Sequence, residues 1–290
     1  MNTAPGRSSW WPETLVLAGL MLVAWLVFRS GAIDLALASG LHSGTGHPWP
    51  VGEQPLWRWC YRLGWFVPAL LALIGLGWLA AGWRSPAWRS WRIDGLFLLL
   101  VLGLGSGLLV DTVLKEITGR PRPRELAIFA NARPGATPAV ATYQPPLVLG
   151  PGTGKSFPSG HAAGVFALLA LWFPLHRRRR WGAAAGVLGL ALGAGALMGY
   201  ARMAQGGHFL SDIVWAALVP AATGVGLAWL LLRRPPELNR KIANAPQMQG
   251  GRKELGSATP GRVRPCGFLA RNIFLYSPSI GGEKNHPSWS

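Results

Sequence analysis

The sequence predicts an all-α integral membrane protein, folded as a bundle of six transmembrane helices. Its mean hydropathy is positive, +0.27, and only 13% of its 290 residues are charged. Six apolar stretches can each form a helix that crosses a bilayer. The 16 tryptophans, which include the Trp10–Trp11 pair before the first stretch, suit the boundary between lipid and water. These features exclude a soluble globular domain.

The predicted spans have individual features that bear on the bundle. The fourth is short and bent near Pro174. The fifth contains pairs of glycines four residues apart, which predict close helix packing at the centre of the bundle. These pairs are Gly182/Gly186, Gly189/Gly193 and Gly195/Gly199. The six spans are 15–28, 64–83, 93–114, 159–176, 183–200 and 213–232.

Two connections between the spans are long. Residues 30–56 contain Gly, Pro and His and are predicted to form a loop, and residues 115–160 form a second, polar loop. Residues 57–65 interleave aromatic and basic side chains. This pattern is typical of a segment that lies at the membrane interface, and we interpret it as an anchor and not as a headgroup site.

The arginines predict the orientation. The short connections 83–92 and 176–181 carry three and four arginines and no acids. They are therefore predicted to lie on the cytoplasmic side of a bacterial inner membrane. Six spans then place both termini on that side. Residues 1–235 form the predicted membrane domain. The polar, Gly/Pro-rich residues 236–290 are predicted to be a disordered cytoplasmic tail.

The charge predicts a partner. The net charge is +17, from 28 Lys and Arg against 11 Asp and Glu. In a soluble protein this excess would indicate nucleic acid. Here the basic residues lie mostly between apolar stretches, so the predicted partner is an anionic lipid bilayer and not nucleic acid. The sequence leaves the oligomeric state open.

Three polar stretches carry the candidate chemistry: KEITGRPRP at 115–123, FPSGH at 157–161 and ARMAQGGHFLSD at 201–212. Two spans separate the second from the third, so all three are predicted to emerge on the periplasmic face. On a helix, Asp212 lies on the same side as His208, and its carboxylate can hold one imidazole nitrogen and leave the other free to attack. The planar guanidinium of Arg202 suits a phosphate.

The three stretches together resemble the signature of the type 2 phosphatidic acid phosphatase family, to which soluble acid phosphatases and vanadium haloperoxidases are similar. The resemblance covers about residues 93–232. It rests on Lys115-x6-Arg122-Pro123, on Pro158-Ser159-Gly160-His161 and on Arg202-x5-His208-x3-Asp212.

The resemblance implies a role for each site residue. His208 is the expected nucleophile, which forms a phosphohistidine. Asp212 orients it, and His161 protonates the leaving oxygen and then acts as base toward water. The residues implied for phosphate binding are Lys115, Arg122, Ser159, Gly160 and Arg202. No metal or other cofactor is expected, because the sequence offers no carboxylate cluster to hold a metal.

The third stretch departs from the usual family pattern. Ala201 stands where the family usually has Ser, so one hydroxyl contact to phosphate is absent. Gln205–Gly207 and 209–211 also differ, in a way that resembles bacterial envelope lipid phosphatases, including those that act on lipid A. The expected substrate is thus a membrane lipid phosphate of the lipid A, undecaprenyl diphosphate or phosphatidate type.

Three functions remain open at the level of sequence. A lipid phosphatase and a lipid phosphotransferase share the same residues and the same intermediate, so the sequence does not separate them. A non-catalytic transporter or scaffold is disfavoured, because ionisable groups at the membrane edge are costly without a use.

One pair of residues extends the family pattern. Asp111 lies four residues before Lys115 on the third span, so both are expected on one helix face. Our hypothesis is that Asp111 orients the Lys115 ammonium toward the phosphate. The alternative is that Asp111 faces water and has no specific partner.

Overall fold

The computed structural model describes residues 9–43, 47–129, 142–150 and 152–232. Within these ranges the chain folds into helices and connecting segments and forms no strand, which confirms the predicted all-α class. The predicted tail, 236–290, and the last residues of the predicted membrane domain, 233–235, lie outside the described residues.

Four long elements match predicted spans. They are α1 (Trp11–Phe28), α5 (Phe66–Arg84), α10 (Trp181–Ala204) and α11 (Leu210–Leu231). The third predicted span is a continuous run that begins as α6 (Arg89–Leu100), is wound as a π-helix over Val101–Leu114, and ends as α7 (Lys115–Thr118). Gly119 ends it with a φ of 54°, a left-handed conformation that favours glycine.

The fourth predicted span is segmented. It consists of α8 (Gly160–Phe166), the 3-10 helix η5 (Ala167–Leu171) and α9 (Trp172–Arg177), which follow one another without a loop. Among the described residues, five helical runs are long and apolar enough to cross a membrane. They are Trp11–Phe28, Pro55–Arg84, Pro86–Glu125, Trp181–Ala204 and Leu210–Leu231. The segmented fourth span is not one of them. The chain is therefore a multi-pass membrane protein, and the count of six spans stays a prediction.

The connection predicted as a loop over 30–56 contains helices instead. These are α2 (Ala32–Leu41) and the single turn α3 (Pro50–Glu53). The loop prediction failed because the Gly, Pro and His residues lie at the ends of these helices, whereas the centre of α2 is a run of good helix formers. The aromatic and basic segment that follows forms α4 (Pro55–Leu63).

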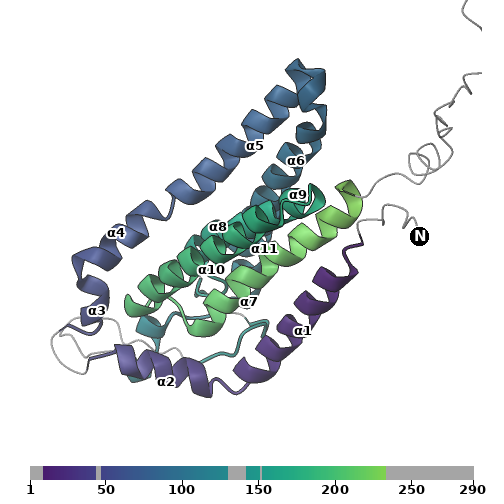
Figure 1. The fold of residues 1–290 in the computed structure, drawn as a ribbon. Coiled ribbons are helices and arrows are strands. Elements are labelled where there is room, and N and C mark those ends of the chain that lie inside the picture. The colour runs from purple at the N-terminus through teal and green to yellow at the C-terminus, as the bar shows by residue number, and fades with distance from the viewer. Residues whose placement is uncertain (1–8, 44–46, 130–141, 151, 233–290) are drawn as a thin grey trace, which may run out of the picture. The chain divides into compact units, whose positions relative to one another are not determined.

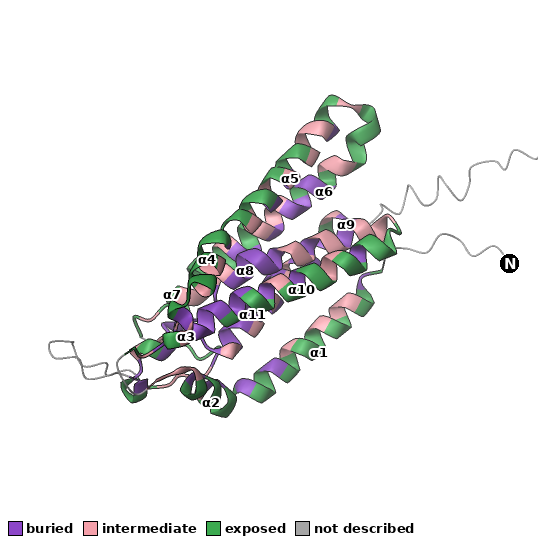
Figure 2. Ribbon diagram, turned by 60° about the vertical axis from the view of Figure 1, so that its left-hand side comes forward, coloured by how far each residue is buried: buried purple, intermediate pink, exposed green. Residues whose placement is uncertain are grey.

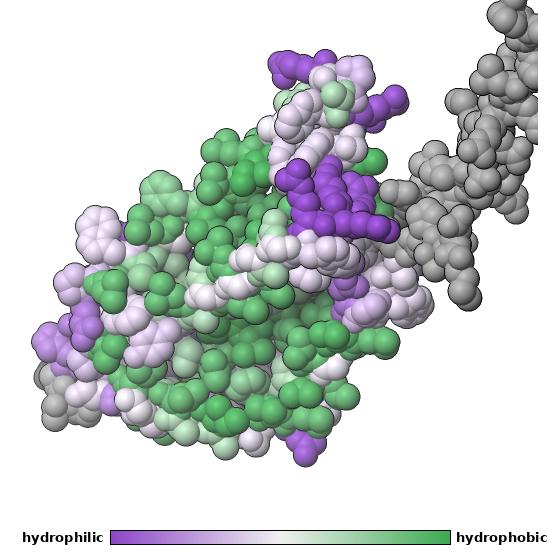
Figure 3. Space-filling model, in the orientation of Figure 1, coloured by the Kyte–Doolittle hydropathy of each residue, from purple (hydrophilic) through white to green (hydrophobic). Residues whose placement is uncertain are grey.

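The helices α8, α10 and α11 pack against one another, and α1 packs on α11 and α5 on α6. Buried residues concentrate on α8 and α11, whereas α1 and α5, which Figure 1 labels, are largely exposed (Figure 2). The exposed side chains are apolar, for example Leu15, Leu70 and Leu73. On one face, hydrophobic side chains cover the middle and hydrophilic ones gather toward the ends (Figure 3). Such a surface suits lipid contact.

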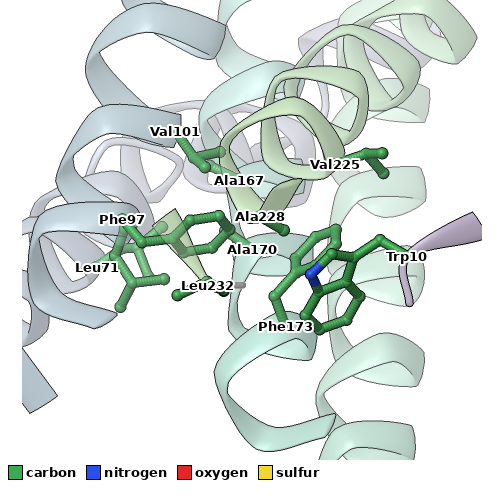
Figure 4. Close-up of a cluster of buried hydrophobic side chains, with 11 residues drawn as sticks. Trp10, Leu71, Phe97, Val101, Ala167, Ala170, Phe173, Val225, Ala228 and Leu232 are labelled. Atoms are coloured by element: carbon green, nitrogen blue, oxygen red, sulfur yellow. The ribbon is translucent and has the colours of Figure 1, made fainter. Parts of the chain in front are cut away.

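A cluster of buried apolar side chains ties several helices together (Figure 4). Trp10 meets the ring of Phe173 edge-on at a centroid distance of 5.3 Å. Phe97 packs on the same ring at 5.5 Å. These residues come from the start of α1, from α6 and from α9, near the arginine-rich turns. The cluster thus stabilises the end of the bundle away from the three motifs.

The prediction for the α10 glycines is only partly correct. Gly195 and Gly199 pack closely, since an added Cβ would lie 2.2 Å from the Phe166 ring and 2.3 Å from Ile213. The other two pairs lie on the exposed side of α10, where an added Cβ would meet no described atom within 4 Å. A helix that is apolar all round does not reveal which face is buried.

Candidate active site

The three motif segments meet at one end of the bundle. The backbone N–H of Ser159 donates to the carbonyl of Asp212 at 3.2 Å, and that of Arg124 donates to Gly206 at 3.1 Å. The N–H of Ser156 donates to Arg120 at 3.0 Å. Each motif segment is thus hydrogen-bonded to another through the main chain, which brings side chains as distant in sequence as Lys115 and His208 to one end of the bundle.

A pocket of about 480 Å³ opens between these segments. Predicted site residues line it from all three motifs: Lys115, Arg122, Gly160, His161, Arg202 and His208. Three further cations also line it: Arg58, Arg124 and Lys155. No carboxylate is among its lining residues, so the pocket is suited to an anion.

His208 lies in the turn between α10 and α11 and is buried. Its Nδ1 is 2.7 Å from the carbonyl oxygen of Ser156. A carbonyl only accepts hydrogen bonds, so Nδ1 carries the proton and Nε2 keeps its lone pair. Burial lowers the pKa of His208, which keeps the imidazole neutral at neutral pH. Both features suit a nucleophile.

Asp212 lies beside the imidazole, as the helical spacing predicts, but it is not the nearest acceptor. Its Oδ2 lies 3.6 Å from Nδ1 of His208, farther than the Ser156 carbonyl. The same oxygen accepts hydrogen bonds from the Ser156 hydroxyl at 2.5 Å and from the Phe209 N–H at 2.8 Å. The geometry therefore suits an Asp212 that acts on His208 through its charge and by fixing Ser156, whose carbonyl contacts the ring; that role stays a prediction. The spacing of the motif gave no sign of Ser156.

Asp212 belongs to a buried network of ion pairs and hydrogen bonds. Arg120 is fully buried and forms ion pairs with Asp212 and with Asp34, which lies on α2. Asp34 also accepts a hydrogen bond from the backbone N–H of Ser211 at 2.9 Å. The remaining donations of the guanidinium go to the Ser211 hydroxyl at 2.8 Å, the Tyr143 hydroxyl at 3.1 Å and the Gln144 carbonyl at 2.8 Å.

Sequence reasoning assigned no role to Arg120 or Asp34. Arg120 lies inside the first motif, but the family resemblance carries no function at that position. Asp34 lay in a stretch predicted to be a loop, where a carboxylate needs no partner. Its place six residues beyond the end of the first apolar stretch was the available signal, because an acid at a membrane edge is costly unless it is paired.

The segment interpreted as an anchor also contributes to the pocket. Tyr61 on α4 stacks on the His161 ring at a centroid distance of 4.5 Å. The Arg202 guanidinium lies over the same Tyr61 ring, 4.7 Å from its centroid. Arg58 lines the pocket as well. Membrane anchoring is thus an incomplete account of residues 57–65, since their helix forms one wall of the site.

The PSGH motif lies at the start of α8. A Cβ at Gly160 would lie 2.0 Å from Oδ1 of Asp111, so the backbone here packs closely against the Asp111 side chain. Ser159 is fully buried and does not line the pocket, unlike the other residues implied for phosphate binding. Its hydroxyl and Nε2 of His161 have no hydrogen-bond partner among the described residues. Of these two residues only His161 lines the pocket, where a ligand can supply the missing partner.

The structure places Asp111 beside Lys115, as the helical spacing predicts. The ammonium donates a hydrogen bond to Oδ1 of Asp111. The lysine side chain is 18% exposed and the aspartate side chain 42%. The contact fits the hypothesis that Asp111 aims the lysine into the pocket, and the role itself stays a prediction.

That role can be tested with Asp111→Asn, which removes the charge and keeps the shape. We expect kcat/KM to fall about 2- to 5-fold, the size of a partly exposed ion pair. The loss should disappear in a Lys115→Ala background, because coupled residues are not additive. The measurement is turnover of the four proteins of this cycle. Equal losses with and without Lys115 would contradict the pairing.

Residues 96–238 match the family model of the PAP2 superfamily, which is the family that the three motifs resemble. The chain belongs to the PAP2 superfamily. The matched region contains the three motifs and the pocket residues that lie on them, whereas Asp34 and α4 lie before it.

Two individual proteins are similar to this PAP2 chain. Over 207 residues it is 27% identical to a lipid A 4'-phosphatase of Francisella tularensis subsp. novicida (strain U112), a match that covers 70% of this chain and 87% of the relative. A solved structure, the transmembrane PAP2-type phosphatidylglycerolphosphate phosphatase from Bacillus subtilis, aligns with a TM-score of 0.46 at 23% identity. That alignment covers 78% of this chain and 96% of the other.

Proposed function

We propose that this protein is a membrane lipid phosphatase that removes a phosphate or diphosphate group from an envelope lipid through a phosphohistidine on His208. The observation that carries the proposal is a neutral imidazole with a free Nε2 in a pocket lined by cations. Membership of the PAP2 superfamily and the similarity to a lipid A 4'-phosphatase support it.

In the first step, the Nε2 lone pair of His208 attacks phosphorus, and the bond between phosphorus and the lipid oxygen breaks. The electron pair stays on that oxygen, which takes a proton from His161. In the second step, water attacks the phosphohistidine and gives a proton to His161. The phosphorus–nitrogen bond breaks and its electron pair returns to Nε2. The products are the dephosphorylated lipid and phosphate.

The pocket supplies the charge that this reaction needs. Phosphoryl transfer depends mainly on positioning and on neutralising the equatorial oxygens. Lys115, Arg122 and Arg202 line the pocket and can do both. Divalent metal ions are held by oxygen ligands, and a pocket of cations without a carboxylate would repel them. We therefore propose that the phosphatase works without a metal.

We further propose that the active site faces the periplasm of the bacterial inner membrane. The arginine-rich turns after α5 and α9 lie at the end of the bundle opposite the motif segments (Figure 1). Arginine-rich short connections favour the cytoplasm. The pocket would then open outward, toward envelope lipids of the outer leaflet.

The test is phosphate release by the purified protein in neutral detergent, with lipid A, undecaprenyl diphosphate or phosphatidate as the single substrate. We expect release from at least one of them, unchanged activity in EDTA, and inhibition by vanadate as a mimic of five-coordinate phosphorus. Loss of activity in EDTA that magnesium restores would contradict the metal-free mechanism. Release only after a second lipid with a free hydroxyl is added would indicate a phosphotransferase. No turnover of any lipid would favour a transporter or scaffold.

A further inference from the structure

The pocket contains more positive charge than the transferred phosphate needs. Lys115, Arg122 and Arg202 belong to the motifs, and the other three cations, Arg58, Arg124 and Lys155, do not. Given the proposed function, we infer that Arg58 and Arg124 form a second anionic subsite, which binds a further phosphate on the same lipid headgroup. The preferred substrate class is thus a lipid that carries two phosphates, either joined as a diphosphate or separated on one headgroup.

The charges of these three cations are not equally available. Lys155 Nζ lies 2.9 Å from a carboxylate oxygen of Glu116, so its charge is largely compensated. Among the described residues, no carboxylate forms an ion pair with Arg58 or Arg124. Two uncompensated guanidinium groups in one pocket repel each other unless an anion lies between them. Guanidinium groups also bind phosphate through paired hydrogen bonds.

The fold holds both arginines at the pocket. Arg124 is fixed by the hydrogen bond from its backbone N–H to Gly206, just before His208. The segment that carries Arg58 lies close to α10 on both sides of α4, at Gly52 on α3 and at Gly64, which follows α4. An added Cβ at Gly52 would lie 2.4 Å from the Ala204 carbonyl, and one at Gly64 would lie 2.3 Å from Met198. The contact with the α10 backbone at Gly52, together with the contact to the Met198 side chain at Gly64, holds the Arg58 helix beside α10 and its motif cation Arg202.

A second arginine on the same helix, Arg62, shows that Arg58 does more than anchor the helix at the membrane surface. Arg62 lies one turn after Arg58 on α4, but it does not line the pocket. Its guanidinium lies over the Trp59 ring, 5.5 Å from the centroid, as an interfacial anchor does. The same helix therefore carries one arginine that packs on an aromatic ring and one that lines the pocket.

The size of the pocket agrees with a larger headgroup. Its volume of about 480 Å³ lies in the range of sites for whole small molecules. A single transferred phosphoryl group would leave much of this space to water. A headgroup with a second phosphate would fill more of it and would bring both anions among the cations.

The inference is tested by comparing the activity of the enzyme on lipids that carry one phosphate with its activity on lipids that carry two. In neutral detergent, kcat/KM is measured for phosphatidate, which has one phosphate, and for lipid A and undecaprenyl diphosphate, which have two. We expect the double variant Arg58→Gln/Arg124→Gln to reduce the ratio of a two-phosphate lipid to phosphatidate by about 10-fold, the scale of a charge-assisted hydrogen bond. The matched control, Arg62→Gln, should leave the ratio unchanged. An equal loss on all three lipids would overturn the inference.

A second experiment distinguishes this inference from the proposed function. Thermal unfolding of the His208→Ala protein is followed with added phosphate or pyrophosphate. Pyrophosphate should raise the Tm more than phosphate does, and the additional Arg58→Gln/Arg124→Gln changes should remove that difference. No difference before those changes would overturn the second subsite even if turnover is normal. If the arginines matter only when anionic lipid vesicles replace neutral detergent, the anion belongs to neighbouring lipids, and the inference is equally wrong.

Discussion

Replacing His208 by alanine is expected to reduce phosphate release by roughly 10⁴-fold or more, as for the loss of the nucleophile from a catalytic unit. The reason is that no other neutral nitrogen is positioned by a carbonyl beside the cations of the pocket, within the part of the chain that the structure describes. The measurement is turnover of the purified variant. His47→Ala is the matched control, because that side chain is 73% exposed and pairs with Glu53.

The covalent step can be followed separately. With a phosphate-labelled lipid, the unmodified protein should carry an acid-labile label after rapid quenching, and His208→Ala should carry none. His161→Ala should form and lose the label slowly, because the leaving oxygen and the attacking water then lack their proton partner. Near-normal turnover of His208→Ala would rule out the phosphohistidine mechanism.

Local patterns in the sequence predicted the parts of this site that depend on short spacings. Asp111 and Lys115 are four residues apart on one helix, so their contact followed from helix geometry alone. The shared location of the three motifs followed from counting spans. Both predictions need only the rise and turn of a helix and the thickness of a bilayer.

The contacts made by Arg120 could not be predicted in this way. It pairs with Asp34, 86 residues earlier, and with Asp212, 92 residues later. No periodic pattern links such positions, because the pairing depends on how α2 folds back against the start of α11. The orientation of His208 by Ser156 also depends on a backbone carbonyl, which every residue has and which no sequence motif marks.

Arg120→Gln is expected to have the second largest effect, and it should reduce both stability and turnover. The guanidinium is fully buried between Asp34 and Asp212, and both carboxylates are themselves buried. Removing one partner of a buried ion pair leaves an uncompensated charge and costs about 3–5 kcal/mol. Arg120→Lys should also be impaired, since an ammonium cannot reproduce the planar set of donors. The measurements are thermal unfolding in detergent and turnover, with the exposed Arg29→Gln as control.

The two effects of Arg120→Gln can be separated with Asp34→Asn. Adding this change removes one of the two uncompensated charges, so the double variant should unfold at a higher temperature than Arg120→Gln alone. Turnover should stay low, because Asp212 would still lack its ion pair, and its hold on Ser156 and hence on His208 would remain weak. If turnover returned together with stability, Arg120 would serve folding only. If Arg120→Gln had normal stability and turnover, the buried network would have no role in positioning the nucleophile.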